Sequence, residues 1–269
     1  MKSRTYFLLV AGWLLAILTS QAQDFQLIDS IGFGPITQAS IDRQNHIYMA
    51  NEAGEINKYD TDGKLLVTFS PTKPATITLL EAWQGIRVFV YYNDFQEYLL
   101  LDRFLTPTQP IKLAAELAFA KLTTLAADDN IWVIDEADYS LKKWDAVQRR
   151  ILVETPFSFL SQFPELEVNY IREYQNLLFI IDYQSGVLVF DNLGNYLKTM
   201  DYKNLTYLNF SGDQMYFLNN QHLQLVNIYN GELLEISLPM KDKFNQALLT
   251  RNRLILIADH YFKIYLKTE

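Results

Sequence analysis

The chain contains no cysteine among its 269 residues. This absence excludes disulfide bonds, catalysis by a thiol and metal sites built from thiolates. It also excludes lipid attachment through a cysteine, so we expect no lipid anchor. A domain of this length can rely on its core instead, and the hydrophobic share of 49 % supplies one.

The sequence also lacks the short motifs that mark common active sites. It has no Gly-x-Ser-x-Gly elbow, Walker loop, dinucleotide fingerprint or zinc-protease helix. Paired carboxylates such as Asp128 and Asp129 are present, but adjacent residues on a strand point to opposite faces. The sequence therefore favours a protein without catalytic activity.

Long apolar runs are missing except at the N-terminus. Lys2 and Arg4 precede a nearly unbroken apolar run, Tyr6 to Leu18, and the small residues Ser20 and Ala22 follow it. This order predicts a secretory signal peptide over residues 1–22. The alternative is a retained membrane anchor, for which the run is short. We expect residues 23–269 to form a single domain with no membrane span.

Basic residues are fewer than acidic ones. The whole chain has a net charge of −8, and removal of the leader leaves 21 basic and 31 acidic residues, a net charge of −10. Such a balance repels phosphate backbones, so we expect no nucleic-acid partner.

A short pattern recurs six times. An apolar run ends in Asn, Asp or a similar residue, a turn follows, a second run ends in an aromatic or Leu before Asp or Asn, and another turn leads to a further strand. The first of these runs in each copy are Ile47–Asn51, Val88–Tyr92, Ile131–Asp135, Leu178–Asp182, Met215–Asn219 and Leu254–Ala258. Self-similarity at about 40 residues, with several strands per period, is typical of a β-propeller. The sequence therefore predicts an all-β, six-bladed β-propeller.

The ends of the chain complement each other. The last copy stops soon after its third strand, and the strand-like run Phe25–Ile31 has no repeat of its own. We expect this N-terminal strand to become the outer strand of the last blade, since that pairing closes the ring and removes exposed sheet edges.

Three segments carry a resemblance to a known family. Asp42–Asn51, Ile56–Asp60 and Gly63–Leu66 resemble the NHL-type repeats of six-bladed propellers, and the third and fourth copies share the likeness. The leader and the Tyr-, Phe- and Asn-rich style resemble envelope proteins of Bacteroidota. Some hydrolase and lactonase relatives hold a channel calcium, but no set of their ligands maps onto this chain.

In a propeller, the loops between the second and third strands gather on one face with the connections between blades. Here those loops are rich in acidic, amide and Tyr side chains. One interpretation is a polar surface that recognises a protein, peptide or glycan; the other is ordinary turn chemistry. The candidate partner-binding residues in these loops are Tyr139, Tyr183, His222, His260 and Tyr261.

Two groups of residues suggest metal sites. The strand-terminal residues Asn51, Asp135, Asp182 and Asn219 carry oxygens that suit Ca²⁺. Their regular spacing favours a structural role in every repeat. The ligands of a metal ion must point to one centre, and recurrence once per repeat does not bring them together. His222 and His260 occupy equivalent loops and, with Asp259, suggest a transition-metal site; surface residues are the alternative.

An aromatic insertion interrupts the connection between the third and fourth copies. It contains Phe157, Phe159 and Phe163. If these rings are exposed, they form a candidate docking site for a partner, since aromatic residues dominate interface hot spots. If they lie between blades, they are ordinary packing.

These observations favour an exported, non-catalytic interaction module of the bacterial envelope. We expect it in the periplasm or at the outer membrane, bound to an envelope protein or complex, with no resident cofactor. The alternatives are a Ca²⁺-dependent hydrolase or lactonase with a channel site, and a glycan or small-ligand receptor. That receptor would use Trp83, Trp132 or Trp144 for stacking, although strand patterns favour core positions for the last two.

Overall fold

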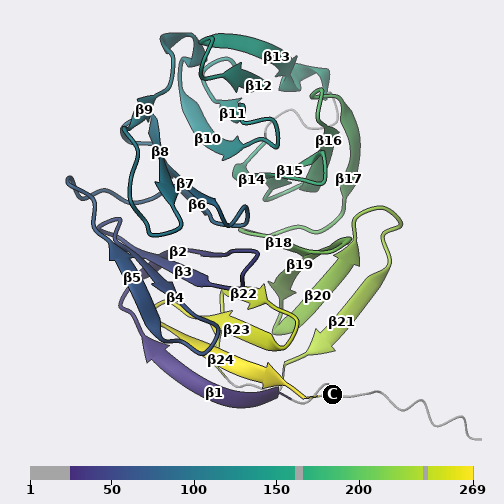
Figure 1. Cartoon of the computed structure of the whole chain (residues 1–269). Coiled ribbons are helices and arrows are strands. Elements are labelled where there is room, and N and C mark those ends of the chain that lie inside the picture. Colours follow the sequence, from purple (N-terminus) through teal and green to yellow (C-terminus); the bar gives the residue numbers. More distant parts are fainter. Residues whose placement is uncertain (1–24, 161–165, 239–241, 269) are drawn as a thin grey trace, which may run out of the picture.

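A computed structural model describes residues 25–160, 166–238 and 242–268. The predicted leader, residues 1–22, and Phe163 lie outside the described residues. Six four-stranded antiparallel sheets stand around one central axis (Figure 1). The predicted six-bladed β-propeller is therefore confirmed.

Each blade contains four strands, which are named below from the axis outwards. They follow one another in the sequence, except that β1 is the outer strand of blade 6. Blades 1 to 3 contain β2 (Ile36–Ile41), β3 (Ile47–Asn51), β4 (Ile56–Tyr59), β5 (Leu65–Phe69), β6 (Leu79–Glu81), β7 (Arg87–Tyr92), β8 (Glu97–Asp102), β9 (Ile111–Lys112), β10 (Ala120–Leu125), β11 (Ile131–Asp135), β12 (Ser140–Asp145) and β13 (Arg150–Pro156). Blades 4 to 6 contain β14 (Val168–Tyr174), β15 (Leu177–Asp182), β16 (Gly186–Asp191), β17 (Tyr196–Met200), β18 (Asn209–Ser211), β19 (Gln214–Asn219), β20 (His222–Asn227), β21 (Leu233–Ser237), β22 (Gln246–Leu249), β23 (Arg253–Ile257), β24 (Tyr261–Lys267) and β1 (Phe25–Gly32). Short 3₁₀ helices, η1 (Ala115–Leu117) and η2 (Phe157–Phe159), follow β9 and β13.

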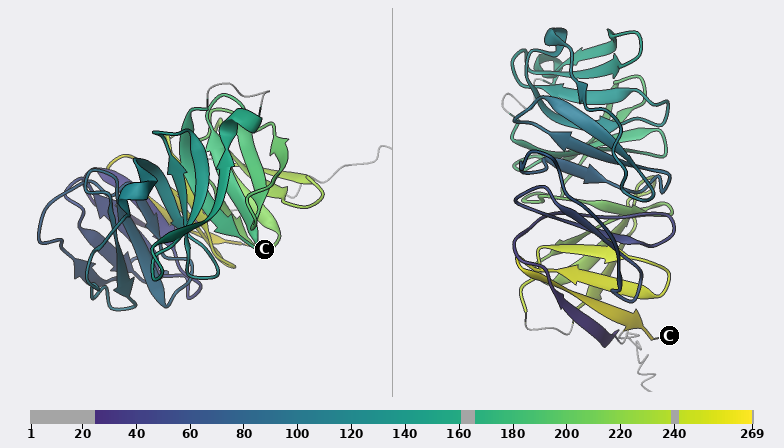
Figure 2. Two further views of the ribbon diagram at one scale, coloured as in Figure 1. Left: turned by 90° about the horizontal axis from the view of Figure 1, so that it is seen from above. Right: turned by 60° about the vertical axis from the view of Figure 1, so that its left-hand side comes forward.

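The N-terminal strand closes the ring, as the sequence predicted. β1 pairs with β24 from Phe25 opposite Lys267 to Gly32 opposite Tyr261. The register shifts once, at Ile28, which forms a bulge. Figure 2 shows β1 (purple) beside β24 (yellow) from two further directions.

Acidic and amide residues shape the turns between the third and fourth strands. In five blades, the side-chain Oδ1 at the end of the third strand accepts backbone N–H groups of the following turn, an arrangement that Asp and Asn form readily. These residues are Asp60, Asp102, Asp145, Asp191 and Asn227. The recurring Asp of the sequence pattern is therefore a turn-forming residue.

One glycine lies where a turn meets the closing strand. Gly63 has φ +90°, and a Cβ atom there would lie 2.3 Å from Cδ1 of Ile31. Its backbone conformation favours glycine, and a side chain there would also displace the end of Ile31.

The core lies mainly between neighbouring blades. Tyr48 of blade 1 belongs to one buried cluster with Val90 of blade 2, and Ile47 to another with Ile255 of blade 6. Successive residues of a strand point to opposite faces of the sheet. Each middle strand therefore contributes side chains to the cores that its blade shares with both neighbouring blades. Trp132 and Trp144 are fully buried, as their strand positions predicted. In the described part of the chain, no helix is long and apolar enough to cross a membrane.

Candidate functional site

The propeller has two chemically different faces. Because the strands alternate in direction, the second-to-third loops share one end of the ring with the connections between blades; we call this end the upper face. The N–H of Ala75, in a connection, donates to the carbonyl of Ala53, in a loop, at 3.3 Å. The first-to-second and third-to-fourth turns lie on the opposite, lower face.

The aromatic insertion divides into an inner and an outer part. Phe157 is 1 % exposed and its ring lies between those of Tyr139 and Phe190, with centroid distances of 5.4 and 6.4 Å. Of the two interpretations given for these rings, packing holds for Phe157, which is a core residue and not part of a docking surface. Phe159, two residues later in η2, is 78 % exposed.

The three predicted tyrosines lie on the upper face in different environments. The Tyr139 hydroxyl accepts the N–H of Leu166 and is partly buried. Tyr261 is also partly buried and its ring meets Phe244 edge to face at 6.3 Å. Tyr183 is the most open of the three. The structure does not gather them into one site.

The two upper-face histidines belong to separate surroundings. His222 is partly buried, with Nδ1 at 3.3 Å from the Ser237 hydroxyl and 3.5 Å from a Glu235 oxygen. His260 is exposed, and its carbonyl accepts backbone N–H groups from the chain after β1. Asp259 instead accepts from the side chain of Asn245. Within the described ranges, no group of three His, Cys, Asp or Glu residues is placed to hold a metal ion.

Asp135 is tied into its own blade. Its side chain is fully buried; Oδ1 accepts the N–H groups of Phe119 and Ala137 at 3.1 Å each, and Oδ2 accepts Lys142 Nζ at 2.8 Å. These contacts match the structural interpretation of the strand-terminal series, in which the side chain fixes a loop to the connection beside it.

The other members of the strand-terminal series also have local partners. Asn51 Oδ1 accepts the N–H groups of Ala53 and Glu55 at 3.0 Å each. Asp182 accepts the N–H groups of Glu167 and Ser185, and Asn219 donates to Gln224 at 3.5 Å. The partners of each residue lie in its own blade or in the connection that leads into that blade.

The central channel holds charges that the sequence interpretation did not single out. Two chambers of about 270 and 260 Å³ lie along the axis, and Arg172 and Asn209 border both of them. Arg172 Nη1 donates to Asn209 Oδ1 at 3.3 Å. This pair therefore separates an upper chamber from a lower one.

Glu81 lines the upper chamber from the end of β6. It is 3 % exposed, and the Thr124 hydroxyl donates to its carboxyl at 2.8 Å. Burial raises the pKa of Glu81 to about 7, against the opposing influence of Arg172 and of the Thr124 hydrogen bond. The chamber thus contains a carboxyl group that ionises near neutral pH.

We expect Glu81→Gln to remove a pH dependence of stability. The ordinary pKa is 4.5 and the folded value about 7, so between them the folded chain binds more protons than the unfolded chain. The free energy of unfolding of the native protein should then fall by about 3 kcal/mol as pH rises through this window. Urea titrations at pH 4.5 and 8 measure the difference between the two proteins. Exposed Glu154→Gln is the control, and parallel profiles for Glu81→Gln and the native protein would contradict the prediction.

The lower face carries a groove between blades 1 and 2. It has a volume of about 950 Å³ and is bordered by the apolar residues Leu66, Ile86 and Phe104 together with Lys58 and Arg103. Apolar walls with a few basic groups are typical of a binding groove.

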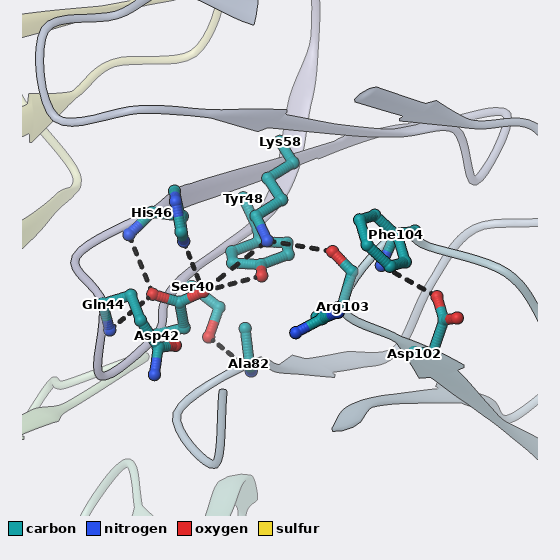
Figure 3. Close-up of polar contacts among 10 residues, drawn as sticks. All are labelled: Ser40, Asp42, Gln44, His46, Tyr48, Lys58, Ala82, Asp102, Arg103 and Phe104. Atoms are coloured by element: carbon teal, nitrogen blue, oxygen red, sulfur yellow. Dashed lines mark hydrogen bonds and ion pairs between the residues drawn. The ribbon is translucent and has the colours of Figure 1, made fainter. Parts of the chain in front are cut away.

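Figure 3 shows the buried polar cluster behind this groove. Oδ1 of Asp42 accepts the N–H groups of Gln44 and His46 at 2.9 and 2.8 Å, and Oδ2 lies 2.9 Å from both His46 Nδ1 and the Tyr48 hydroxyl. Burial and the neighbouring Asp42 raise the pKa of Tyr48, which keeps its proton. The four contacts occupy the Asp42 carboxylate and make it a support of the groove.

Lys58 reaches this cluster from β4. Its Nζ donates to the carbonyl of Arg103 at 3.0 Å and lies 3.9 Å from Asp42 (Figure 3). Burial lowers the pKa of Lys58, with Arg103 acting in the same direction and Asp42 against it. Lys58 therefore ties blade 1 to the third-to-fourth turn of blade 2.

Bulky apolar side chains stand at the tips of turns on the lower face. Four of them occupy the same position, two residues after the turn-forming Asp or Asn, in blades 2 to 5; Ile86 occupies a first-to-second turn. We call this set the lower apolar ring; its members are Ile86, Phe104, Val147, Leu193 and Tyr229, with exposed fractions of 78, 62, 92, 65 and 58 %. In blade 1 the equivalent residue is Asp62, which pairs with Arg253.

Turn chemistry does not explain the lower apolar ring. Such positions favour Gly, Asn, Asp and Ser, and a set of large apolar side chains gathered on one face of a domain is a feature of binding surfaces. The sequence did contain a signal, since an apolar residue two places after the turn-forming residue repeats in four copies.

Two comparisons based on sequence give no match. No protein-family model matches the chain, and no curated protein matches it. The NHL-type resemblance therefore stays a prediction.

Solved β-propellers resemble the structure. The WD40 domain of Neurospora crassa Pan2 aligns with a TM-score of 0.63 and 8 % identity, covering 92 % of this chain and 97 % of that one. Virginiamycin B lyase from Staphylococcus aureus gives 0.61 and 11 %, covering 91 and 100 %. The extracellular domain of a hybrid two-component system from B. thetaiotaomicron gives 0.54 and 12 %, covering 85 and 33 %. Identities this low show the fold alone, a β-propeller.

Proposed function

We propose that the chain is an exported, non-catalytic propeller whose lower face binds an envelope protein. The observation that carries this proposal is the lower apolar ring, which presents one large apolar side chain on each of four consecutive blades. The extracellular propeller domain among the similar structures supports an exported location. We place the protein in the periplasm or at the outer membrane, in agreement with the expected leader.

The groove beside Phe104 indicates the chemistry of the partner. Its apolar walls are bordered by Lys58 and Arg103, whereas the Asp102 carboxylate is engaged by the N–H groups of Phe104 and Thr106 at 2.8 Å each. An extended segment with apolar side chains and an acidic residue would complement this surface. Charge complementarity of this kind fixes the register of a complex and excludes wrong partners.

A triple substitution of the lower apolar ring tests the proposal. Phe104→Ser, Val147→Ser and Leu193→Ser together should lower recovery of the envelope partner at least tenfold, because buried anchors dominate interface energies. The measurement is quantitative isolation of the tagged protein from gently solubilised envelopes, with photo-crosslinking at position 147 in cells. The matched control replaces Leu152, Leu197 and Leu234, exposed apolar residues on outer strands, with Ser.

Three outcomes would overturn the proposal. The first is a native protein recovered alone under gentle conditions, and the second is a triple variant that keeps its partner. The third is a homodimer, seen by light scattering, that the triple substitution breaks, since a second copy would then occupy the lower face.

The exposed residues of the upper face remain a second proposed docking surface. Phe159 and Tyr183 are the exposed aromatic residues among the described members of the predicted set. Phe159→Ser combined with Tyr183→Ser should leave the partner bound if the lower face is the interface.

A channel site for a small molecule is the alternative function. The upper chamber supports it through Glu81 and Arg172, and a lyase occurs among the similar structures. The Ca²⁺-dependent hydrolase remains a proposal based on resemblance alone.

A further inference from the structure

The lower chamber of the channel concentrates arginine side chains. Arg172 borders it from β14, Arg43 from the turn after β2, and Arg251 from the turn after β22. Arg172 is 6 % exposed, whereas Arg43 and Arg251 are open to solvent. Three blades thus contribute one cation each, one at the base of the chamber and two nearer its mouth.

In the described part of the chain none of the three arginines forms an ion pair, although the charge of Arg172 acts on the carboxyl of Glu81 in the upper chamber. Asp42 also borders the chamber, but its carboxylate is engaged by His46, Tyr48 and the N–H of Gln44. Three arginines thus border the lower chamber of a chain whose net charge is −8, against one carboxylate, Asp42, which lies 3.9 Å from Lys58 Nζ.

Two buried N–H donors at this chamber have no hydrogen-bond partner among the described residues. They are Nε of Arg172 and Nε1 of Trp83. Leaving a buried donor unsatisfied costs about 1–3 kcal/mol, and more for a charged group. Oxygen atoms of an anionic ligand would satisfy both donors and neutralise the arginines.

Three aromatic residues are among those that line the chamber. The rings of Tyr174 and Phe210 stack at 4.3 Å with an interplanar angle of 15°, and Trp83 meets Tyr174 edge to face at 6.5 Å. Arg43 lies over the Trp83 ring at 5.3 Å and Arg172 over the Phe210 ring at 5.1 Å. Flat surfaces of this kind favour a planar organic group through stacking.

We propose that the lower chamber binds a small organic anion, a planar aromatic group that carries a carboxylate or a phosphate. Arg172 and Trp83 donate hydrogen bonds to the anionic group, while Arg43 and Arg251 attract it to the mouth. The volume of about 260 Å³ lies just under the range of about 300–1,000 Å³ typical of drug-sized pockets, so the ligand is small. This site is independent of docking on the lower apolar ring.

Titration calorimetry with defined probes tests the proposal. Phenyl phosphate and benzoate distinguish the two anionic groups, inorganic phosphate lacks the ring, and benzyl alcohol lacks the charge. All are titrated at equal ionic strength adjusted with sodium chloride. We expect saturable binding of at least one aromatic anion, at least tenfold tighter than benzyl alcohol and than inorganic phosphate.

Substitutions at the mouth keep the test independent of folding. Arg43→Gln with Arg251→Gln should lower the affinity for the aromatic anion at least tenfold, because it removes two positive charges from the mouth of the chamber. Both side chains are exposed, so their loss leaves the core intact. Trp83→Phe keeps a ring and removes the donor, and should weaken binding severalfold. The matched control is Arg149→Gln with Arg150→Gln, an exposed pair at the start of β13, which should bind like the native protein.

Several results would overturn the proposal. These are no saturable binding of either aromatic anion up to 10 mM, equal affinity for benzyl alcohol, and unchanged affinity in the Arg43 and Arg251 variant. Equal affinity for inorganic phosphate and for the aromatic anions would overturn the inference that the ligand carries an aromatic ring. A triple-serine variant of the lower apolar ring that binds the anion normally but loses its partner would separate this site from the proposed docking function.

Discussion

A chain that begins after Gly32 should lose about 5 kcal/mol of stability and self-associate. Deleting residues 25–32 removes the ladder between β1 and β24, which holds seven pairs of facing residues. Each net hydrogen bond contributes about 0.5–1.5 kcal/mol, and the packing of Phe25 and Ile31 against the cores of blade 6 adds to this. The deletion also exposes the β24 edge, a template for pairing with another chain. Urea unfolding and light scattering measure the two effects.

Point substitutions in β1 provide the control. Ile31→Ser removes a side chain that packs beside Gly63 and should destabilise by about 2 kcal/mol. Ile28→Ser acts at the bulge, where the side chain is 42 % exposed, and should cost little. A deleted chain that remains monomeric and as stable as the native protein would show that β1 does not seal the ring.

The fold was predictable because its determinants are local and repeated. The turn-forming Asp60, Asp102 and Asp191 follow apolar runs at similar spacing, and such turns mark the end of the third strand in five of the six blades. The closing role of the N-terminal strand, predicted over Phe25–Ile31 and observed over Phe25–Gly32, followed from counting strands at the two ends. Neither inference required knowledge of distant contacts.

The candidate sites were less predictable because they depend on placement across blades. Phe157 and Phe159 look equivalent in sequence, but one 3₁₀ turn directs the first into the core and the second to solvent. Glu81 and Arg172 come from blades 2 and 4 and occupy the same position of the repeat, opposite Phe89 and Phe179, but the residue type at this position differs from blade to blade. The available signal for a channel site was the presence of charged residues on the inner strands, because the strands that line the axis are otherwise largely apolar or uncharged.

Lys142→Met should destabilise the protein by about 3–5 kcal/mol at pH 7, because it leaves the fully buried Asp135 without its cation. Burial opposes the charge of Lys142, but its hydrogen bonds to Asp135 and Asp138 outweigh that and raise its pKa above the ordinary 10.5. The stabilisation is therefore complete below about pH 10.5 and is lost as pH rises through the folded value. Urea unfolding at pH 7 and 11 measures both parts.

A matched surface pair separates this effect from loss of charge alone. Lys121→Met breaks an exposed pair with Glu136 and should change stability by less than about 1 kcal/mol. Equal effects of the two substitutions would contradict the structural role of Lys142.

The same variant distinguishes the two interpretations of Asp135. If Asp135 were a Ca²⁺ ligand, removing Lys142 would free one carboxylate oxygen, and CaCl₂ should then raise the melting temperature of Lys142→Met more than that of the native protein. The structure predicts no such difference, since the other oxygen stays engaged by the N–H groups of Phe119 and Ala137. Asp138 also contacts Lys142, but within the described residues no group of three His, Cys, Asp or Glu residues is placed to hold a metal ion. A calcium-dependent rise confined to Lys142→Met would restore the metal interpretation for this position and favour the channel hydrolase over the interaction module.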